Sequence, residues 1–149
     1  MPGASALFLS LAAVSFGQEP EPTFRDPPGC WDGSQHELNV CAYKEFEHAD
    51  QAMNAQWNKT SVLMKRLDAR AGPPNEIIGN ISHFDALLNG QRAWLAYRDA
   101  HCPIFGASGG SMKPMLVAIC RRDLTQARTE QLKGLMLNPA TGNPYFEDQ

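Results

Sequence analysis

The sequence has no excess of positive charge and no long apolar segment. Its 149 residues include 13 Lys and Arg against 16 Asp and Glu, and this net charge of −3 argues against a nucleic-acid-binding protein. The N-terminal apolar run, Ala4 to Phe16, is too short to span a bilayer. We therefore expect one small domain that neither binds nucleic acid nor spans a membrane.

Lys and Arg are also missing ahead of this run, where a secretory signal normally carries positive charge. The small residues Ser15 and Gly17 nevertheless fit the small-x-small cleavage pattern, with a cut near Gly17–Gln18. No cysteine ends the run, so we expect no lipid anchor. Residues 1–17 are thus interpreted as a signal peptide for export to the periplasm or the cell exterior; the alternative is a buried N-terminal helix.

Few apolar side chains follow this segment. Residues 18–29 contain four prolines and three acidic residues, so they cannot bury enough apolar surface to offset the entropy lost on ordering the chain. We expect an extended, Pro-rich leader here, with the folded domain beginning at Cys30.

Cysteine is scarce, and none of the four cysteines forms a Cys-x-x-Cys pair. The four histidines lack zinc-finger spacing, so we expect no bound metal and no cofactor. In a small exported chain, four cysteines indicate two disulfides, for which three pairings exist. The sequence does not choose among them, although the arrangement favours the local pairs Cys30–Cys41 and Cys102–Cys120. Each would close a loop of roughly 10 to 20 residues and stabilise the fold by about 3 kcal/mol.

Proline and glycine are absent between Ser34 and Ala71, which permits one long helix. Ser34 and Glu37 form a capping-box signature at its start, and Gly72-Pro73-Pro74 ends it. Residues expected on its buried side recur mostly every three or four positions, as in an amphipathic helix. They are Leu38, Cys41, Phe46, Ala49, Met53, Trp57, Thr60, Met64 and Leu67.

A second helix is predicted over residues 83–101, where Ser82 and Asp85 give a second capping signature. Asn89-Gly90 would elsewhere suggest a turn, but the apolar period continues through it. Residues 103–114 are rich in Gly and Ser and predict a flexible loop.

A third helix is predicted from about Pro114 to Leu137, followed by a polar tail over residues 138–149. The side chains expected on its buried side are Met115, Leu116, Ile119, Cys120, Leu124, Ala127, Leu132 and Leu135. The predicted fold is all-α, a disulfide-stabilised bundle of one long and two medium helices behind an extended leader.

Three groups of residues are typical of one family of small exported bacterial proteins. They are Cys41, Ala49, Asp50, Met53 and Asn54; then Gln91, Trp94, Tyr97, Arg98, Asp99 and Cys102; then Cys120, Thr125, Arg128 and Leu132. With Gly109-Gly110-Ser111 between the last two groups, the chain resembles the lysozyme inhibitor LprI N-terminal domain family from about Cys30 to Leu135. It departs from the family pattern at Met53, where Leu is usual, and at Trp57, where Tyr is usual. The resemblance assigns residues 30–137 to one LprI-like domain.

The resemblance implies an exported protein that blocks a lysozyme by protein–protein contact. Lysozymes cleave with two carboxylates in a cleft, and hydrogen-bond donors or a cation could be inserted toward them. The Gly-rich loop offers such groups, and its candidate inhibitory residues are Ser108, Gly109, Gly110, Ser111 and Lys113. The alternative for the loop is a plain surface connection. The alternative for the protein is a structural or envelope-associated docking module with no lysozyme target.

The polar residues of the family pattern are expected to form a network that links the three helices. Its members are Asp50, Asn54, Arg98, Asp99 and Arg128. Buried charges need such partners, so a structural role is favoured over a ligand site. Trp94 and Trp57 are interpreted as core anchors at helix–helix contacts.

No arrangement of residues indicates an enzyme. Ser108 and Ser111 lack the Gly-x-Ser-x-Gly turn of a serine hydrolase, since the local sequence is Ala-Ser-Gly-Gly-Ser. With the cysteines in disulfides, no nucleophile–base pair is apparent. We therefore expect a non-enzymatic binding protein.

Overall fold

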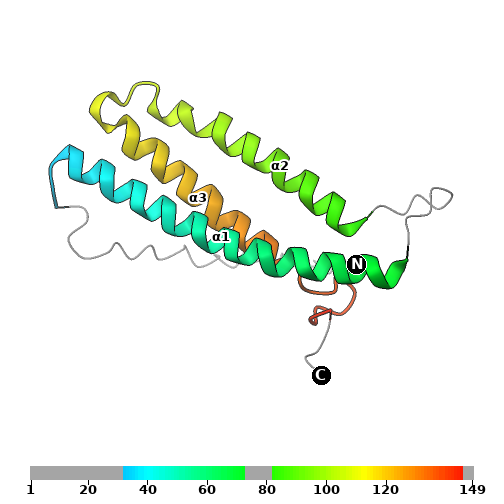
Figure 1. Cartoon of the computed structure of the whole chain (residues 1–149). Coiled ribbons are helices and arrows are strands. Elements are labelled where there is room, and N and C mark those ends of the chain that lie inside the picture. The colour runs from blue at the N-terminus through cyan, green and yellow to red at the C-terminus, as the bar shows by residue number, and fades with distance from the viewer. Residues whose placement is uncertain (1–31, 73–81, 146–149) are drawn as a thin grey trace, which may run out of the picture.

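Three helices make up the part of the chain that the structure, a computed structural model, describes: residues 32–72 and 82–145. They are α1 (Gln35–Ala71), α2 (His83–His101) and α3 (Lys113–Gly134). Figure 1 shows α1 running the length of the bundle, with α2 and α3 beside it and joined to each other at one end. The described residues contain no strand, so the predicted all-α three-helix bundle is confirmed.

The ends of α1 lie where the sequence placed them. The Ser34 hydroxyl accepts a hydrogen bond from the Glu37 N–H, and the Glu37 carboxylate accepts one from the Ser34 N–H at 2.7 Å. Gly72 ends the helix with φ +80°, a conformation that residues with a Cβ rarely adopt. α2 likewise begins after Ser82 and continues through Asn89-Gly90 without a break.

The connection between α2 and α3 is more regular than the flexible loop expected over residues 103–114. It contains two short 3₁₀ helices, η2 (Cys102–Gly106) and η3 (Gly110–Met112). Backbone hydrogen bonds run from the Gly109 N–H to the Gly106 carbonyl at 3.3 Å and from the Met112 N–H to the Gly109 carbonyl at 2.9 Å. Glycine and serine therefore allow tight, hydrogen-bonded turns in this connection, and the predicted flexible loop is not observed.

α3 ends at Gly134 rather than at the predicted Leu137. Leu137 instead forms an isolated antiparallel bridge with Pro144, and the Asn138 N–H donates to the Asn143 carbonyl at 2.8 Å. The first residues of the predicted polar tail thus turn back against the end of the bundle.

The buried side of α3 also differs from the predicted one. Ala127 and Leu135 are exposed, although both were expected in the core. The buried residues recur at spacings of three and four, and half of them are polar: Met115, Ala118, Arg122, Thr125, Thr129 and Leu132. Their polar groups have partners: the Thr129 hydroxyl donates to the Thr125 carbonyl at 2.9 Å, and Arg122 lies 2.7 Å from Glu45 of α1. The prediction from hydropathy alone was therefore wrong for part of the buried face of α3.

The core lies mainly between α1 and α3, with the N-terminal half of α2 closing one end. Its larger cluster of buried side chains consists of Met53, Leu63, Met64, Leu87 and Leu132. A smaller cluster nearer the α2–α3 connection consists of Ala42, Met115 and Ala118. The Thr60 hydroxyl donates to the Leu132 carbonyl at 3.0 Å, so a polar group crosses the α1–α3 contact without being left unpaired.

A disulfide joins the end of α2 to α3. Cys102 pairs with Cys120, as predicted, with Cα atoms 5.5 Å apart, and Cys102 is completely buried. Cys41 is also disulfide-bonded. The expected Cys30–Cys41 pair involves a residue outside the described part of the chain, as do the signal segment 1–17 and the leader 18–29, so these remain predictions.

Asp68, near the end of α1, caps the start of α2. Its carboxylate accepts hydrogen bonds from the Ser82 hydroxyl at 2.8 Å and from the backbone N–H groups of His83 and Phe84 at 2.7 and 3.0 Å. It also lies 2.8 Å from the His83 ring. Desolvation opposes ionisation, but the hydrogen bonds from Phe84, His83 and Ser82 outweigh it and hold the pKa of Asp68 well below its usual range.

We expect Asp68→Asn to lower the free energy of unfolding by about 1–3 kcal/mol, because an amide satisfies these donors less well. A lowered folded-state pKa means that the carboxylate stabilises the fold above its unfolded pKa, near 4, and that this contribution is lost as the pH falls further. Urea unfolding of both proteins from pH 7 to pH 2 should therefore show a stability difference that shrinks below about pH 4. Glu47→Gln, at an exposed position of α1, is the control; an equal effect of the two variants would contradict the assignment.

Candidate functional site

The end of the bundle where α2 meets α3 carries the loop that the sequence singled out, residues 103–113, here called the tip loop. Two glycines let it pack on the first turns of α3. A Cβ atom on Gly106 would lie 2.6 Å from Lys113 Cγ and 2.9 Å from Val117 Cγ2. A Cβ atom on Gly109 would lie 3.1 Å from the backbone of Lys113. The tip loop is therefore held close to α3 by contacts that a side chain at these positions would disturb.

Two further links fix the tip loop. The Cys102–Cys120 disulfide joins the residue just before it to the second turn of α3. The Asn39 side chain of α1 donates a hydrogen bond to the Ser111 carbonyl at 3.0 Å. Gly110 has φ +53°, which favours glycine at that turn. All three helices thus contribute to the position of this loop.

The candidate inhibitory residues reach the surface of the tip loop. Ser108, Gly110, Ser111 and Lys113 are exposed, and Gly109 is half-buried. Within the described part of the chain, the Ser108 and Ser111 hydroxyls and the Lys113 ammonium have no hydrogen-bond partner. They are consequently available as donors to another molecule.

Exposed apolar side chains surround these donors, and the sequence reasoning missed them. Ile104 is 67 % exposed, Phe105 51 % and Met112 42 %. Phe105 packs edge-to-face on the His101 ring, with centroids 5.5 Å apart. The available signal was an Ile-Phe pair directly after Pro103, followed by the small residues of positions 106–111. Apolar groups next to unpaired donors are typical of a protein-binding surface.

Four of the five predicted network residues meet around Arg98 of α2, whose side chain is only 9 % exposed. Its Nη1 lies 3.0 Å from Asp50 Oδ1 on α1 and 3.3 Å from the Thr125 hydroxyl on α3. Its Nε donates to Asp99 Oδ1 at 3.1 Å. The Asn54 amide donates to the other oxygen of Asp50 at 3.0 Å. A single guanidinium group therefore contacts all three helices.

Arg128, the fifth residue, lies apart from these carboxylates. It donates to Gln91 Oε1 at 2.9 Å and to Gln131 Oε1 at 3.1 Å, and burial lowers its pKa. Its link to Arg98 is the ring of Trp94, whose centroid lies 5.2 Å from the Arg98 guanidinium and 6.0 Å from that of Arg128. Trp94 and Trp57 are both half-buried and pack against the larger core cluster.

A second ion pair between helices was not predicted. Arg122 of α3 is buried and lies 2.7 Å from Glu45 of α1. Arg122 also lies 2.8 Å from Asp123, its neighbour on α3. Arg122 follows Cys120 closely in sequence, but polar residues at core positions are not visible to an analysis of apolar periodicity. The pair ties α1 to α3 near the tip loop.

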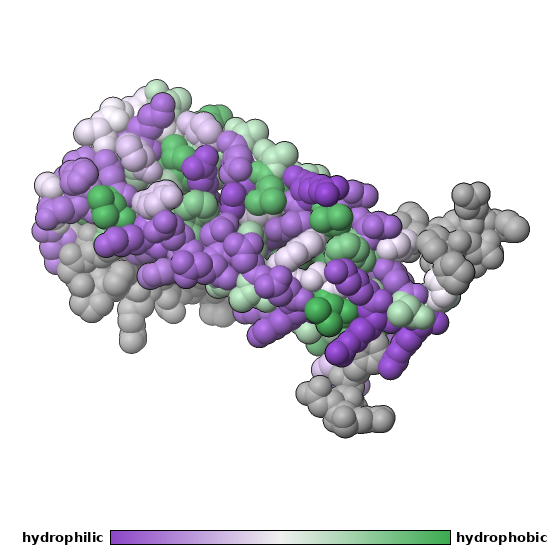
Figure 2. Space-filling view, in the orientation of Figure 1, coloured by the Kyte–Doolittle hydropathy of each residue, from purple (hydrophilic) through white to green (hydrophobic). Residues whose placement is uncertain are grey.

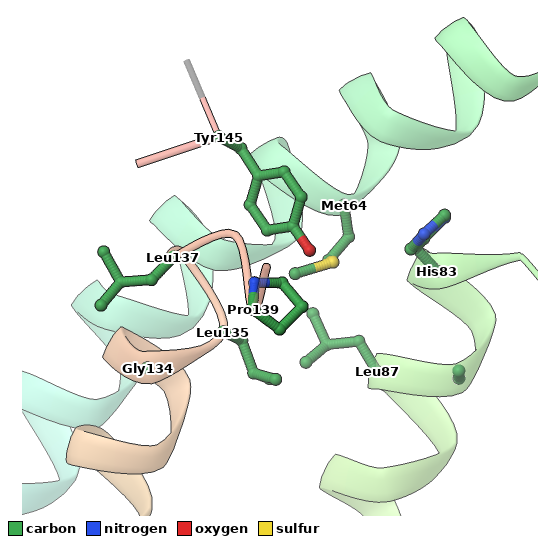
Figure 3. A pocket seen from close by; sticks show the side chains of 9 residues that line it. Met64, His83, Leu87, Gly134, Leu135, Leu137, Pro139 and Tyr145 are labelled. Atoms are coloured by element: carbon green, nitrogen blue, oxygen red, sulfur yellow. The ribbon is translucent and has the colours of Figure 1, made fainter. Parts of the chain in front are cut away.

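A pocket of about 430 Å³ lies at the opposite end of the bundle. Met64 of α1, Leu87 of α2, and Pro139 and Tyr145 after α3 converge on it (Figure 3). No predicted site residue lines it.

The described residues hold no group of three His, Cys, Asp or Glu side chains placed to bind a metal ion. Among the helices described, none has the length and apolar character needed to cross a membrane.

The Arg98 contacts predict strong coupling between residues on different helices. Arg98→Met leaves Asp50 without its partner and should lower the free energy of unfolding by about 1–3 kcal/mol, less than for a fully buried pair because Asp50 is partly exposed. The Arg98→Met and Asp50→Asn changes should be non-additive by at least about 0.5 kcal/mol in a double-mutant cycle measured by urea unfolding. Additive effects would mean that the contact contributes nothing to stability.

Comparison with known proteins identifies relatives for most of the chain. Residues 30–132 match the family described as Lysozyme inhibitor LprI. A protein of Rhizobium meliloti (strain 1021), named as uncharacterized, is 37 % identical over 135 residues, which cover 89 % of this chain and 92 % of that protein. No solved structure matches the chain. The protein belongs to the lysozyme inhibitor LprI family.

Proposed function

We propose that this protein is an exported, non-enzymatic inhibitor that blocks a lysozyme by direct contact, and that the tip loop makes the contact. Family membership supports an inhibitor rather than an enzyme. The observation that carries the tip-loop assignment is a set of exposed, unpaired donors on a loop fixed by a disulfide and by contacts from three helices.

The chemistry of the tip loop suits the target. A lysozyme cleaves its glycan with two carboxylates that flank the scissile bond. An ammonium group such as that of Lys113, with the hydroxyls of Ser108 and Ser111, can form charge-assisted hydrogen bonds to carboxylates. A loop inserted in this way excludes the glycan from the cleft.

The rigidity of the tip loop favours affinity. A loop already fixed in its bound conformation loses less entropy on binding than a flexible loop. Phe105 and Met112 supply apolar contact area beside the donors, and aromatic side chains are frequent among the residues that dominate binding energy. The hydroxyls and Lys113 then set orientation, while the apolar neighbours exclude water.

Charge and compartment agree with this function. A net charge of −3 favours encounter with a cationic lysozyme, chiefly by raising the association rate. Disulfides persist in oxidising compartments outside the cytosol, where a lysozyme would be met. The predicted signal peptide, residues 1–17, lies outside the described part of the chain.

The oxidised protein should slow peptidoglycan lysis by at least one of the c-type, i-type and g-type lysozymes in a turbidity assay. Lys113→Glu should weaken inhibition by about tenfold or more, since one charge-assisted contact is replaced by repulsion. Lys59→Glu is the matched control, because it changes the net charge equally at an exposed position of α1. No inhibition of any class at micromolar excess would favour the docking-module alternative. An equal loss of inhibition in the two variants would indicate that the contact with lysozyme lies outside the tip loop.

Gly106→Ala tests whether the shape of the tip loop matters. The added Cβ atom collides with Lys113 and Val117, so we expect weaker inhibition and a loss of about 1–3 kcal/mol in stability. Gly134→Ala introduces the same methyl group where nothing lies within 4 Å, and it should leave both quantities nearly unchanged. Full inhibition by Gly106→Ala at unchanged stability would show that the loop tolerates rearrangement.

A further inference from the structure

The pocket at the end of the bundle opposite the tip loop has no part in the proposed lysozyme contact. Its volume of about 430 Å³ lies within the range that is typical of small-molecule sites in proteins. All three helices and the turn after α3 contribute to its wall. Among the described residues that line it, only His83 and Tyr145 have polar side-chain groups. The pocket is therefore suited to a mainly apolar ligand.

The pocket has a buried apolar wall and an exposed apolar rim. Met64 and Leu87 are buried, whereas Leu135 and Leu137 are 42 % and 44 % exposed. Gly134 contributes open space, because a Cβ atom there would meet nothing within 4 Å. Figure 2 shows green, hydrophobic atoms among the purple ones toward the end of the bundle where α2 begins. A ligand in the pocket would remove part of this apolar surface from water.

Hydrogen bonds fix the walls of the pocket without a ligand. The Asn138 N–H donates to the Asn143 carbonyl at 2.8 Å, which closes the turn after α3. The Tyr145 N–H donates to the Met136 carbonyl at 3.4 Å, and the Tyr145 side chain packs against the core. On the α2 side, the Asp68 carboxylate holds the first turn of the helix. A pocket that is already formed loses little entropy when a ligand binds.

The Tyr145 hydroxyl supplies a hydrogen-bonding group inside the pocket. It points into the pocket on the side of Met64 (Figure 3). Within the described part of the chain, this hydroxyl has no hydrogen-bond partner. The His83 ring, in contrast, already contacts the Asp68 carboxylate through Nδ1 at 2.8 Å. A tyrosine hydroxyl can donate and accept, and one in apolar surroundings usually has a partner.

We propose that this pocket binds a small, uncharged and mainly apolar molecule whose single hydroxyl or carbonyl group pairs with the Tyr145 hydroxyl. The volume limits its size. At about 30 Å³ for a group as large as a water molecule, the pocket accommodates about 14 non-hydrogen atoms. Medium-chain alcohols and alkylphenols are of this size. The site does not rest on lysozyme inhibition.

Charge and polarity exclude other ligand classes. No Lys or Arg is among the described residues that line the pocket, so an anion would lose hydration without gaining a partner. The Asp68 carboxylate beside His83 would also repel it. A cation finds this carboxylate already occupied by hydrogen bonds from the start of α2. A sugar would bury more hydroxyls than the pocket can pair.

Nonan-1-ol is a suitable probe. Its titration into the oxidised protein, followed by NMR of the methyl groups, should show saturable binding with a Kd of about 10–500 μM. The signals of Met64 and Leu87 should shift, whereas that of Met112 in the tip loop should not. Nonanoate and nonylammonium have the same chain length but carry a charge, so each should bind at least about tenfold more weakly. No saturable binding of nonan-1-ol, or equally tight binding of either ion, would overturn the proposal.

Tyr145→Phe tests the hydrogen bond. Loss of the hydroxyl should weaken nonan-1-ol binding by about three- to tenfold, because the alcohol then has no partner in the pocket. Tyr43→Phe removes the same group at an exposed position of α1 and should bind the alcohol like the wild type. Unchanged affinity in Tyr145→Phe would show that the hydroxyl does not contact the ligand.

Gly134→Leu tests the location of the site. A leucine side chain at this position should occupy part of the pocket and weaken nonan-1-ol binding by at least about tenfold. Gly90→Leu is the matched control, because a Cβ atom there also meets nothing within 4 Å and Gly90 does not line the pocket. Circular dichroism checks that both variants keep their helical content. Equal affinity in the two variants, or binding that appears only after residues 146–149 are removed, would contradict the assignment.

Discussion

Burial of the Arg98 guanidinium is the interaction on which the arrangement of the three helices depends. α1 and α3 share the most extensive contact, whereas α2 adds Leu87 to the core and is held in place by three specific links. These are the Asp68 carboxylate at its N-terminus, Arg98 in its last turn, and the Cys102–Cys120 disulfide just beyond. A buried cation needs its partners in fixed positions. Arg98 therefore fixes how α2 is rotated about its own axis, and where it lies along that axis, relative to α1 and α3.

Most of these links lie at the end of the bundle that carries the tip loop, and they make that end rigid. Arg98, the disulfide and the Glu45–Arg122 pair all lie toward that end, and the donors at the loop surface are consequently presented on a stiff base. At the other end Asp68 fixes the start of α2, and a pocket remains beside it. The molecule thus has one firmly held end, which carries the tip loop, and a pocket at the other.

The sequence predicted those features that depend on neighbouring residues. Ser34 with Glu37, Gly72, and Ser82 with Asp85 placed the helix ends, and local spacing favoured the Cys102–Cys120 pair. It misplaced the buried side of α3, because Arg122, Thr125 and Thr129 are polar by type and buried through partners that no periodicity reveals. The Asp50–Arg98 contact was anticipated from a family pattern, whereas the pairing of Arg128 with Gln91 depends on the way two helices cross.

The Cys102–Cys120 disulfide separates the packing of the helices from the sequence of the tip loop. With the Cα atoms of Cys102 and Cys120 held 5.5 Å apart, the path that leaves α2 and the path that enters α3 are fixed independently of what lies between them. The solvent-exposed residues of the tip loop can therefore be replaced, and the loop can be lengthened or shortened, without changing how the three helices pack. The helical scaffold and the loop that we propose as the lysozyme contact are therefore separable units of variation. A change of target would then require a change in one short segment only, while the helices stay the same.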